Sequence, residues 1–142
     1  MHAWPELRAL LRSDRDLARA RLSQMVSVIH DAEETRLTIV FDGKGDSLSV
    51  ECPTHSKTFA HIYTPAGTTA DDVIEQMVGK AADPSSFWVA TDDRAEQQTV
   101  EATGATSLSA AELLAWIARA GKRQDSQLDT RRRANDKDWK HQ

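Results

Sequence analysis

The sequence predicts a three-layer α/β fold whose sheet is mostly parallel. Apart from a short first helix and a minor strand at 48–51, helical and strand patterns alternate along the chain in the order α, β, β, α, β, α, β, α, which is typical of a sheet covered by helices on both faces. One strand candidate, residues 37–41, is an apolar run interrupted only by Thr38, as expected for a strand buried on both faces. At 142 residues the chain is long enough to bury a core as one domain.

The first half of the chain predicts two helices and three strands. A short helix begins at Pro5, and a longer one shows apolar residues at helical spacing with Ser13 as its N-cap. Residues 42–46 are rich in Gly and Asp and predict a turn after the first strand. The expected segments are helices at 5–11 and 14–30 and strands at 37–41, 48–51 and 58–63.

The second half predicts three helices and two strands, followed by a basic tail. Ser109 and Glu112 have the spacing of a capping box that opens the last helix. The expected segments are helices from 69, 94–103 and from 109, and strands at 87–90 and 105–108. Because few apolar side chains follow residue 121, we expect a domain of residues 1–121 and a basic extension, 122–142, that is either helical or disordered.

The charge is divided unevenly along the chain. The formal net charge is −4, yet residues 122–142 hold seven Lys or Arg and only four Asp. A basic tail on an acidic body can contact a polyanion such as RNA, although an ordinary solvated terminus has the same composition.

The composition also bears on the compartment. The single Cys52 excludes an internal disulfide framework, and no apolar run approaches the roughly 20 residues of a membrane helix. Residues 1–5 lack the basic and apolar regions of a signal peptide. We therefore expect a cytoplasmic protein that does not contact the membrane.

Three aspartates, Asp42, Asp71 and Asp93, each follow an apolar run or begin a predicted helix. In an alternating β/α chain such positions meet at one edge of the sheet, where ligands bind. Carboxylates gathered there repel one another unless a cation lies among them, and a hard divalent cation is the usual ligand. The pattern predicts a metal site for phosphoryl-transfer or nuclease chemistry.

Each of these aspartates also has a structural interpretation. Asp71 and Asp72 both fall in a first helical turn, where carboxylates offset the helix dipole. Helical geometry places Asp71 at the margin of the apolar stripe and Asp72 toward water, so we assign Asp71 to the site and Asp72 to capping. Asp42 precedes a glycine, a common turn pair. Of Asp92 and Asp93, we expect one to cap the next helix and the other to face the sheet edge.

Other kinds of site find little support. The six glycines form no phosphate-binding loop, the histidines and Cys52 have no zinc spacing, and no strand-elbow serine suggests a hydrolase triad. A phosphotransfer receiver or phosphatase would need paired acids after a first strand and a lysine late in the chain, and neither is evident. We expect Trp88 and Trp116 to pack in the core.

An ordered set of short motifs resembles the YacP-like branch of the NYN domains, within the PIN-like nuclease superfamily. The similarity spans about residues 2–120. The matching segments are His-Ala-Trp-Pro-Glu-Leu at 2–7, Val-Phe-Asp at 40–42, Thr-Ala-Asp at 69–71, Val-Ala-Thr-Asp-Asp at 89–93, Glu-Gln at 96–97, Gly-Ala at 104–105 and Ser-Ala-Ala-Glu-Leu at 109–113.

The resemblance implies a Rossmann-like PIN fold and a divalent-metal endoribonuclease that, in some relatives, cleaves mRNA on the ribosome. Asp71 matches the acidic residue of the family's Thr-Ala-Asp motif, and Asp93 matches the aspartate after Thr-Ser. Asp42 matches the aspartate that ends the second strand. Mg²⁺ or Mn²⁺ would be the cofactor, and Asp92 would be a fourth candidate ligand.

The chain departs from the family pattern at its start, because the usual first strand and its Asp-Gly motif are missing. We expect that the sequence begins after this strand rather than that the protein lost a ligand, because a sheet without its central strand leaves backbone groups unpaired. A strand exchanged with a second copy would be another way to fill the gap.

The leading hypothesis is therefore hydrolysis of RNA phosphodiester bonds, with mRNA at the ribosome as one setting. The residues expected to hold the RNA backbone are Arg94, Lys44, Arg131, Arg132 and Arg133. The alternative is a catalytically impaired RNA- or ribosome-binding module derived from a nuclease, because a first ligand is missing.

Overall fold

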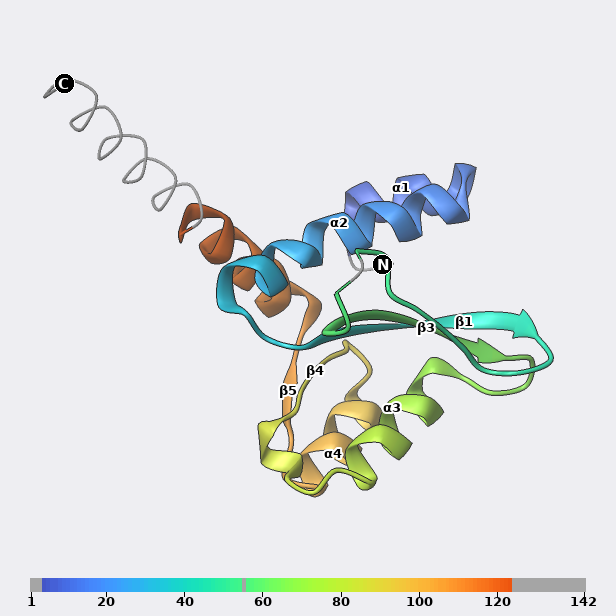
Figure 1. Ribbon diagram of the computed structural model, residues 1–142, viewed down its shortest axis with the longest axis vertical. Coiled ribbons are helices and arrows are strands. Elements are labelled where there is room, and N and C mark those ends of the chain that lie inside the picture. The colour runs from blue at the N-terminus through green and yellow to red at the C-terminus, as the bar shows by residue number, and fades with distance from the viewer. Residues whose placement is uncertain (1–3, 55, 124–142) are drawn as a thin grey trace, which may run out of the picture.

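Three layers of secondary structure stack in this computed structural model, which describes residues 4–54 and 56–123. Helices α1 and α2 lie on one side of the strands, and α3 and α4 lie on the other (Figure 1). The helices are α1 (Pro5–Ser13), α2 (Arg15–Glu33), α3 (Ala70–Gly79), α4 (Arg94–Ala102) and a last helix over residues 110–123. The α/β fold with a mostly parallel sheet that the sequence predicts is confirmed.

The strands form two separate sheets. In the larger sheet β1 is parallel to β3, and the short β2 pairs antiparallel with the other edge of β3. In the smaller sheet β4 is parallel to β5. The strands are β1 (Leu37–Gly45), β2 (Ser49–Glu51), β3 (Phe59–Pro65), β4 (Trp88–Ala90) and β5 (Thr106–Leu108). Within the described residues β1 and β4 do not pair, and the first strand is the one that begins at Leu37.

Strand β1 extends further than the sequence predicts. Residues 42–45 were expected in a turn, but β1 continues to Gly45, with a shift in the β1–β3 register between Phe41 and Gly45. The shift is possible because Gly43 has no side chain: a Cβ there would overlap the carbonyl oxygen of Thr64. The Gly43 N–H donates to Oγ1 of the buried Thr64 at 3.1 Å. This tertiary contact turns a local turn sequence into a β-bulge.

The helix starts follow their capping side chains. Helix α2 is capped by Asp14, whose carboxylate accepts from the backbone N–H groups of Asp16 and Leu17 at 3.0 and 3.2 Å. The prediction that Ser13 caps this helix is wrong. Ser13 belongs to the last turn of α1, where its hydroxyl donates to the Leu10 carbonyl. The capping box at Ser109 and Glu112 is confirmed by hydrogen bonds in both directions.

The core lies between the strands and the helices on each side. Val78, Val89, Val100 and Ala105 form a buried cluster that joins α3, β4, α4 and the segment before β5. Trp88 was expected in the core but is 59% exposed. Because side chains alternate along a strand, the buried Val89 places Trp88 on the opposite face, where its ring lies 5.8 Å from that of Trp116.

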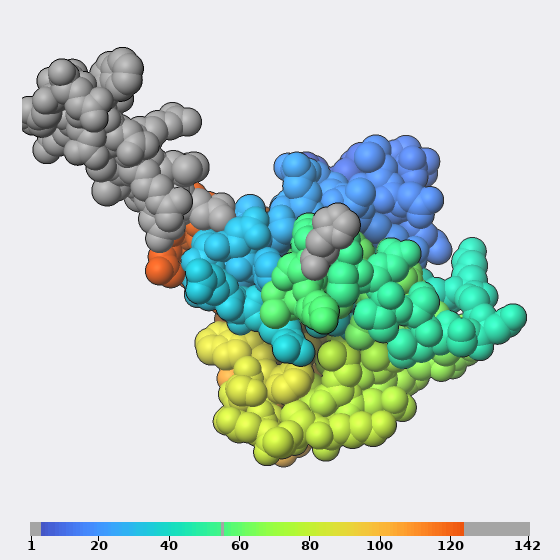
Figure 2. Space-filling model, in the orientation of Figure 1, coloured from blue at the N-terminus to red at the C-terminus, as the bar shows by residue number. Residues whose placement is uncertain are grey.

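The surface shows where the bulged end of β1 lies. The β1–β2 connection, turquoise in Figure 2, projects at one side of the molecule, beside the N-terminal helices. None of the helices in residues 4–54 and 56–123 combines the length and apolar character needed to cross a membrane.

Candidate functional site

Where β1 and β4 end and α3 and α4 begin, burial and neighbouring carboxylates raise the pKa values of Asp71 and Glu96. We call this set of carboxylates the acidic cluster; its members are Asp42, Asp71, Glu75, Asp93 and Glu96. The structure thus brings together Asp42, Asp71 and Asp93, the three aspartates that the sequence singles out, and adds two glutamates from α3 and α4.

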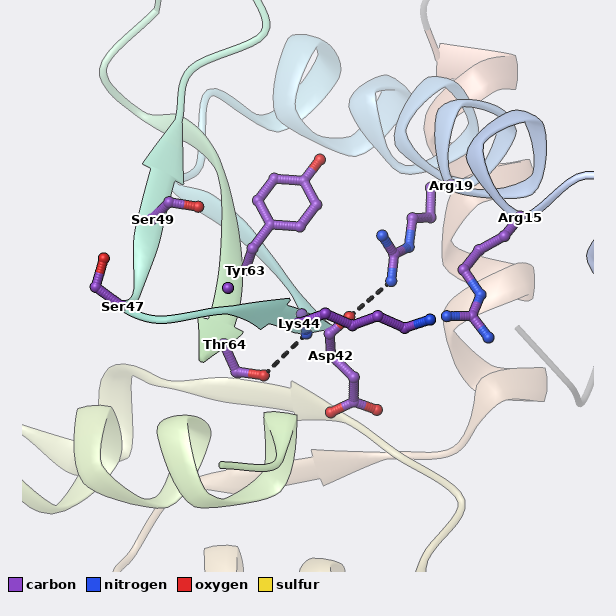
Figure 3. A pocket seen from close by; sticks show the side chains of 10 residues that line it. Arg15, Arg19, Asp42, Lys44, Ser47, Ser49, Tyr63 and Thr64 are labelled. Atoms are coloured by element: carbon purple, nitrogen blue, oxygen red, sulfur yellow. Dashed lines mark hydrogen bonds between the residues drawn. The ribbon is translucent and has the colours of Figure 1, made fainter. Parts of the chain in front are cut away.

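Asp42 connects the acidic cluster to two helices. Its Oδ1 accepts a hydrogen bond from the backbone N–H of Ala70, the first residue of α3, at 2.8 Å. Its backbone carbonyl accepts from Nη2 of Arg19 on α2 at 2.7 Å. The Asp42 side chain points toward α3 and away from Arg19 (Figure 3). The bulge in β1 and these two contacts set the position of the carboxylate.

Asp71 and Asp72 are separated as the helical geometry predicts. Asp72 is exposed and completes a capping box, accepting from the Thr69 N–H at 3.2 Å and donating its own N–H to Thr69 Oγ1 at 3.1 Å. Asp71 is half-buried. Burial raises the pKa of Asp71, and the charges of Asp93, Asp42, Glu75 and, least of all, Asp72 raise it further. Asp71 therefore belongs to the acidic cluster, whereas Asp72 holds the start of α3.

Glu96 is the most buried member of the acidic cluster, with 4% of the residue exposed. Its Oε1 is buried and has no hydrogen-bond partner in the described part of the chain. Burial, a hydrogen bond with Glu75 and the charges of Asp71 and Asp93 raise the pKa of Glu96 to about 7. A buried carboxylate oxygen without a partner is costly, and a proton or a cation relieves that cost.

Glu96 and Glu75 are two site residues that the sequence pattern did not single out. Glu96 lies three residues after the N-cap Asp93, where a glutamate is ordinarily explained by capping. Helical spacing could have indicated both residues. Glu96 lies four residues before the buried Val100, and Glu75 lies four residues after Asp71. Residues with this spacing share a helix face.

Asp92 and Asp93 cap different helices. Oδ1 of Asp93 accepts from the N–H groups of Ala95 and Glu96 at the start of α4, at 2.9 and 3.4 Å. Oδ1 of Asp92 accepts from the Ala110 N–H at 2.7 Å, where the last helix begins. Asp93 contributes to the raised pKa values of Asp71 and Glu96, whereas Asp92 contributes to neither. The structure therefore places Asp93, and not Asp92, in the acidic cluster.

The donor chemistry of the acidic cluster fits a hard divalent cation. Carboxylate oxygens are the ligands that Mg²⁺ and Mn²⁺ prefer, and Oε1 of Glu96 is available as a donor. Across residues 4–54 and 56–123, no three His, Cys, Asp or Glu side chains already stand at metal-binding geometry. Like charges repel, so carboxylates without a cation draw apart or bind protons.

The basic residues expected to bind RNA fall in three places. Lys44, in the bulge of β1, lines a cavity beside Asp42 together with Arg15 and Arg19 (Figure 3). Arg94 is exposed at the first position of α4. Arg131, Arg132 and Arg133, with the rest of the basic extension, lie outside the described residues.

Comparison with known proteins shows the family and agrees with the fold. The family model of the YacP-like NYN domain matches residues 1–142. The chain is similar to two crystal structures of Rae1 (YacP) from Bacillus subtilis, at 27% identity over 91% of this chain. The structure of a mutant form gives a TM-score of 0.72 with 76% of that chain covered, and the other gives 0.71 with 74% covered. No match is found among curated proteins.

Proposed function

The chain belongs to the YacP-like NYN domain family, and from that premise we propose that it is a metal-dependent endoribonuclease acting on RNA at the acidic cluster. The family has a PIN-like nuclease fold, which suggests RNA as the substrate. The observation that carries the proposal is a chain of neighbouring carboxylates. Asp93 and Asp42 lie close enough to Asp71 to add to the effect of burial on its pKa. Asp71 and Asp93 likewise add to the raised pKa of Glu96, whose buried Oε1 has no partner in the described residues.

Four side chains are the proposed metal ligands: Asp71, Asp93, Asp42 and Glu96. A bound Mg²⁺ or Mn²⁺ would supply Lewis acidity and an activated water for attack on the phosphodiester. Asp42 and Asp93 each use Oδ1 to accept a backbone N–H, which fixes the direction of the carboxylate. Their Oδ2 atoms make no hydrogen bond within residues 4–54 and 56–123 and are free to bind a ligand.

Glu96 adds a proton-linked element to this site. With its pKa near 7, its carboxyl group is partly protonated at neutral pH when no cation is bound. Glu96 would hold a cation only as the carboxylate, so cation binding would be linked to loss of its proton. Burial and neighbours such as Glu75 raise the pKa of Glu96 and so favour its protonated form.

The setting of the reaction is also part of the proposal. The family resemblance suggests mRNA on the ribosome, which would place the protein in the cytoplasm. Arg94 and the basic extension are the proposed contacts to the RNA backbone outside the acidic cluster, through charge and not through base recognition.

The test is cleavage of a labelled RNA by the purified full chain with Mg²⁺ or Mn²⁺, compared with EDTA. The key variant is Asp71→Asn, and its control is Asp72→Asn, which removes the same charge one residue away but keeps a capping side chain. We expect cleavage that needs metal, is lost in Asp71→Asn and persists in Asp72→Asn. Intact RNA in the presence of metal, or full activity of Asp71→Asn, would contradict the proposal.

A second candidate is an RNA-binding module without catalysis. It is favoured by one observation: no preformed set of three metal ligands exists in the described part of the chain. This candidate predicts RNA binding that is the same with and without a chelator, and no cleavage under any of the conditions above.

A further inference from the structure

A cavity of about 340 Å³ opens between the start of α2 and the bulged end of β1 (Figure 3). Three cationic side chains line it: Arg15 and Arg19 from α2, one helical turn apart, and Lys44 from the bulge. Hydroxyl-bearing side chains from β2 and β3, Ser49 and Tyr63 among them, complete the polar lining. We call this cavity the cation pocket.

No salt bridge neutralises the three cations of the cation pocket in the described residues, although two acidic side chains lie near its lining. Burial raises the pKa of Tyr63, a lining residue, and the charges of Glu51 and Asp16 raise it further. Asp42 is the one acidic residue in the lining, and its carboxylate is engaged with the Ala70 N–H on the α3 side. Three cations around one cavity repel one another, and an anion bound between them would replace this repulsion with attraction.

Arg19 is held in a fixed orientation. Its guanidinium carbon lies 5.1 Å from the ring centroid of Phe41 and 5.7 Å from that of Tyr63, and these two rings stack on each other at 5.5 Å. Nη2 donates to the Asp42 carbonyl, while the buried Nε has no partner in the described part of the chain. A planar guanidinium fixed in this way is suited to binding a phosphate, since little rotamer entropy remains to be lost.

The cation pocket and the acidic cluster share Asp42. The same residue lines the pocket, accepts Arg19 on its backbone oxygen and raises the pKa of Asp71 on its other side. A negative strand approaching the acidic cluster would be repelled by it, and cations immediately beside the cluster offset that repulsion. The two sites are therefore placed to act on neighbouring parts of one polyanion.

We propose that the cation pocket binds a phosphate group of the RNA strand adjacent to the phosphodiester held at the acidic cluster. This inference rests on the proposed RNA-directed function, but it concerns binding and not cleavage. The phosphate is either an internal one or a terminal monophosphate, because both present the same oxygens to Arg15, Arg19 and Lys44.

The test measures binding of a short single-stranded RNA, labelled at its 3′ end, to the full chain in EDTA, where metal and cleavage are absent. Arg15→Gln and Lys44→Gln remove exposed pocket charges, and Arg19→Lys keeps the charge but loses the planar fork. The controls are Arg36→Gln, before the opposite end of β1, and Lys80→Gln, at the end of α3; both residues are exposed and lie outside the pocket. Thermal unfolding of each variant verifies that it is folded.

We expect each pocket variant to weaken binding roughly threefold to tenfold, and each Gln variant to reduce the slope of log affinity against log salt by about one, because one phosphate contact is lost. The controls should change affinity less than twofold. Comparing 5′-phosphate with 5′-hydroxyl RNA separates the two phosphate sources. A preference for the 5′-phosphate that the pocket variants abolish identifies the terminal group, and equal losses on both RNAs identify an internal phosphate.

Pocket variants that bind RNA as well as Arg36→Gln and Lys80→Gln would overturn the inference. Its failure is distinguishable from failure of the proposed catalysis. If RNA is never cleaved but the pocket variants lose binding, the cation pocket stands and the endoribonuclease proposal falls. If RNA is cleaved and the pocket variants bind normally, the endoribonuclease proposal stands and the cation pocket proposal falls.

Discussion

Asp42 and Ala70 are joined by a hydrogen bond of 2.8 Å that runs from the first backbone N–H of α3 to a side chain in the bulge of β1. The contact spans 28 residues of sequence and links the strand end to the helix that carries Asp71. Asp42 thus has a structural role and a proposed ligand role, and substitutions can separate the two.

The first prediction separates these roles of Asp42. Asp42→Ala should lower the free energy of unfolding by about 1 kcal/mol, because the helix-start N–H loses its acceptor. Asp42→Asn keeps an acceptor oxygen and should stay within about 0.5 kcal/mol of the wild type, yet lose at least about tenfold in metal-dependent RNA cleavage. Urea unfolding in EDTA and a cleavage assay measure the two effects. An Asn variant with full cleavage would remove Asp42 from the ligand set.

The second prediction concerns pH. The pKa of Glu96 is raised to about 7 in the folded protein, from 4.5 ordinarily. Between these values the folded state binds more protons than the unfolded state, so stability falls as pH rises from about 4.5 to above 7. Without metal, titration of Glu96 should lower the free energy of unfolding by about 1–3 kcal/mol at pH 8 relative to pH 4.5.

Glu96→Gln tests this linkage, because an amide cannot titrate. Without metal, the variant should be more stable than the wild type at pH 8 and should show a flatter profile of unfolding free energy between pH 5 and 8. Glu101→Gln, at an exposed position of the same helix, is the control and should follow the wild-type profile. Parallel profiles for Glu96→Gln and the wild type would show that Glu96 does not bind a proton in this range.

The third prediction concerns metal and its competition with protons. Mn²⁺ or Mg²⁺ should raise the melting temperature, and the rise should be larger at pH 8 than at pH 5.5, because the cation needs deprotonated carboxylates. The increase should disappear in Asp71→Asn and remain in Asp72→Asn. Thermal unfolding followed with and without metal at both pH values provides the measurement. An increase that is equal in both variants would place the cation elsewhere.

The fourth prediction concerns the glycine in the bulge. Gly43→Ala places a Cβ onto the carbonyl oxygen of Thr64, so the β1–β3 pairing must shift, at a cost of roughly 1–3 kcal/mol. Gly79→Ala is the matched control, because a Cβ there meets nothing within 4 Å and the residue lies at the end of α3. That change should be neutral or stabilising by up to about 1 kcal/mol. Chemical denaturation measures the free energy of unfolding of both variants. Equal changes in the two would show that the contact with Thr64 is not what constrains Gly43.

The order of helices and strands could be predicted because periodicity is a local property of the sequence. The continuation of β1 through residues 42–45 could not, since Asp-Gly looks like a turn until Thr64 is known to lie opposite Gly43. The exposure of Trp88 was missed for a similar reason. Its position opposite Val89 depends on which face of β4 the helices cover.

The candidate site was predictable in part. Strand and helix ends located Asp42, Asp71 and Asp93, because the topology of an α/β chain brings such ends together. Glu96 was hidden by its position in the first turn of α4, where capping is a sufficient explanation, and its burial arises from packing. The cation pocket was only partly visible in Lys44, since Arg15 and Arg19 reach it from a helix distant in sequence.

The acidic cluster lies where β1 and β4, strands of two separate sheets, come to an end. Within the described residues no backbone hydrogen bonds join β1 to β4, and α3 contacts β1 and β3 on one side and α4 on the other. Asp42 lies on β1, whereas Asp93 and Glu96 lie at the start of α4. A divalent ion bound by Asp42, Asp93 and Glu96 together would link β1 to the start of α4. We therefore expect amide protons of both β1 and β4 to exchange with solvent more slowly once the ion is bound.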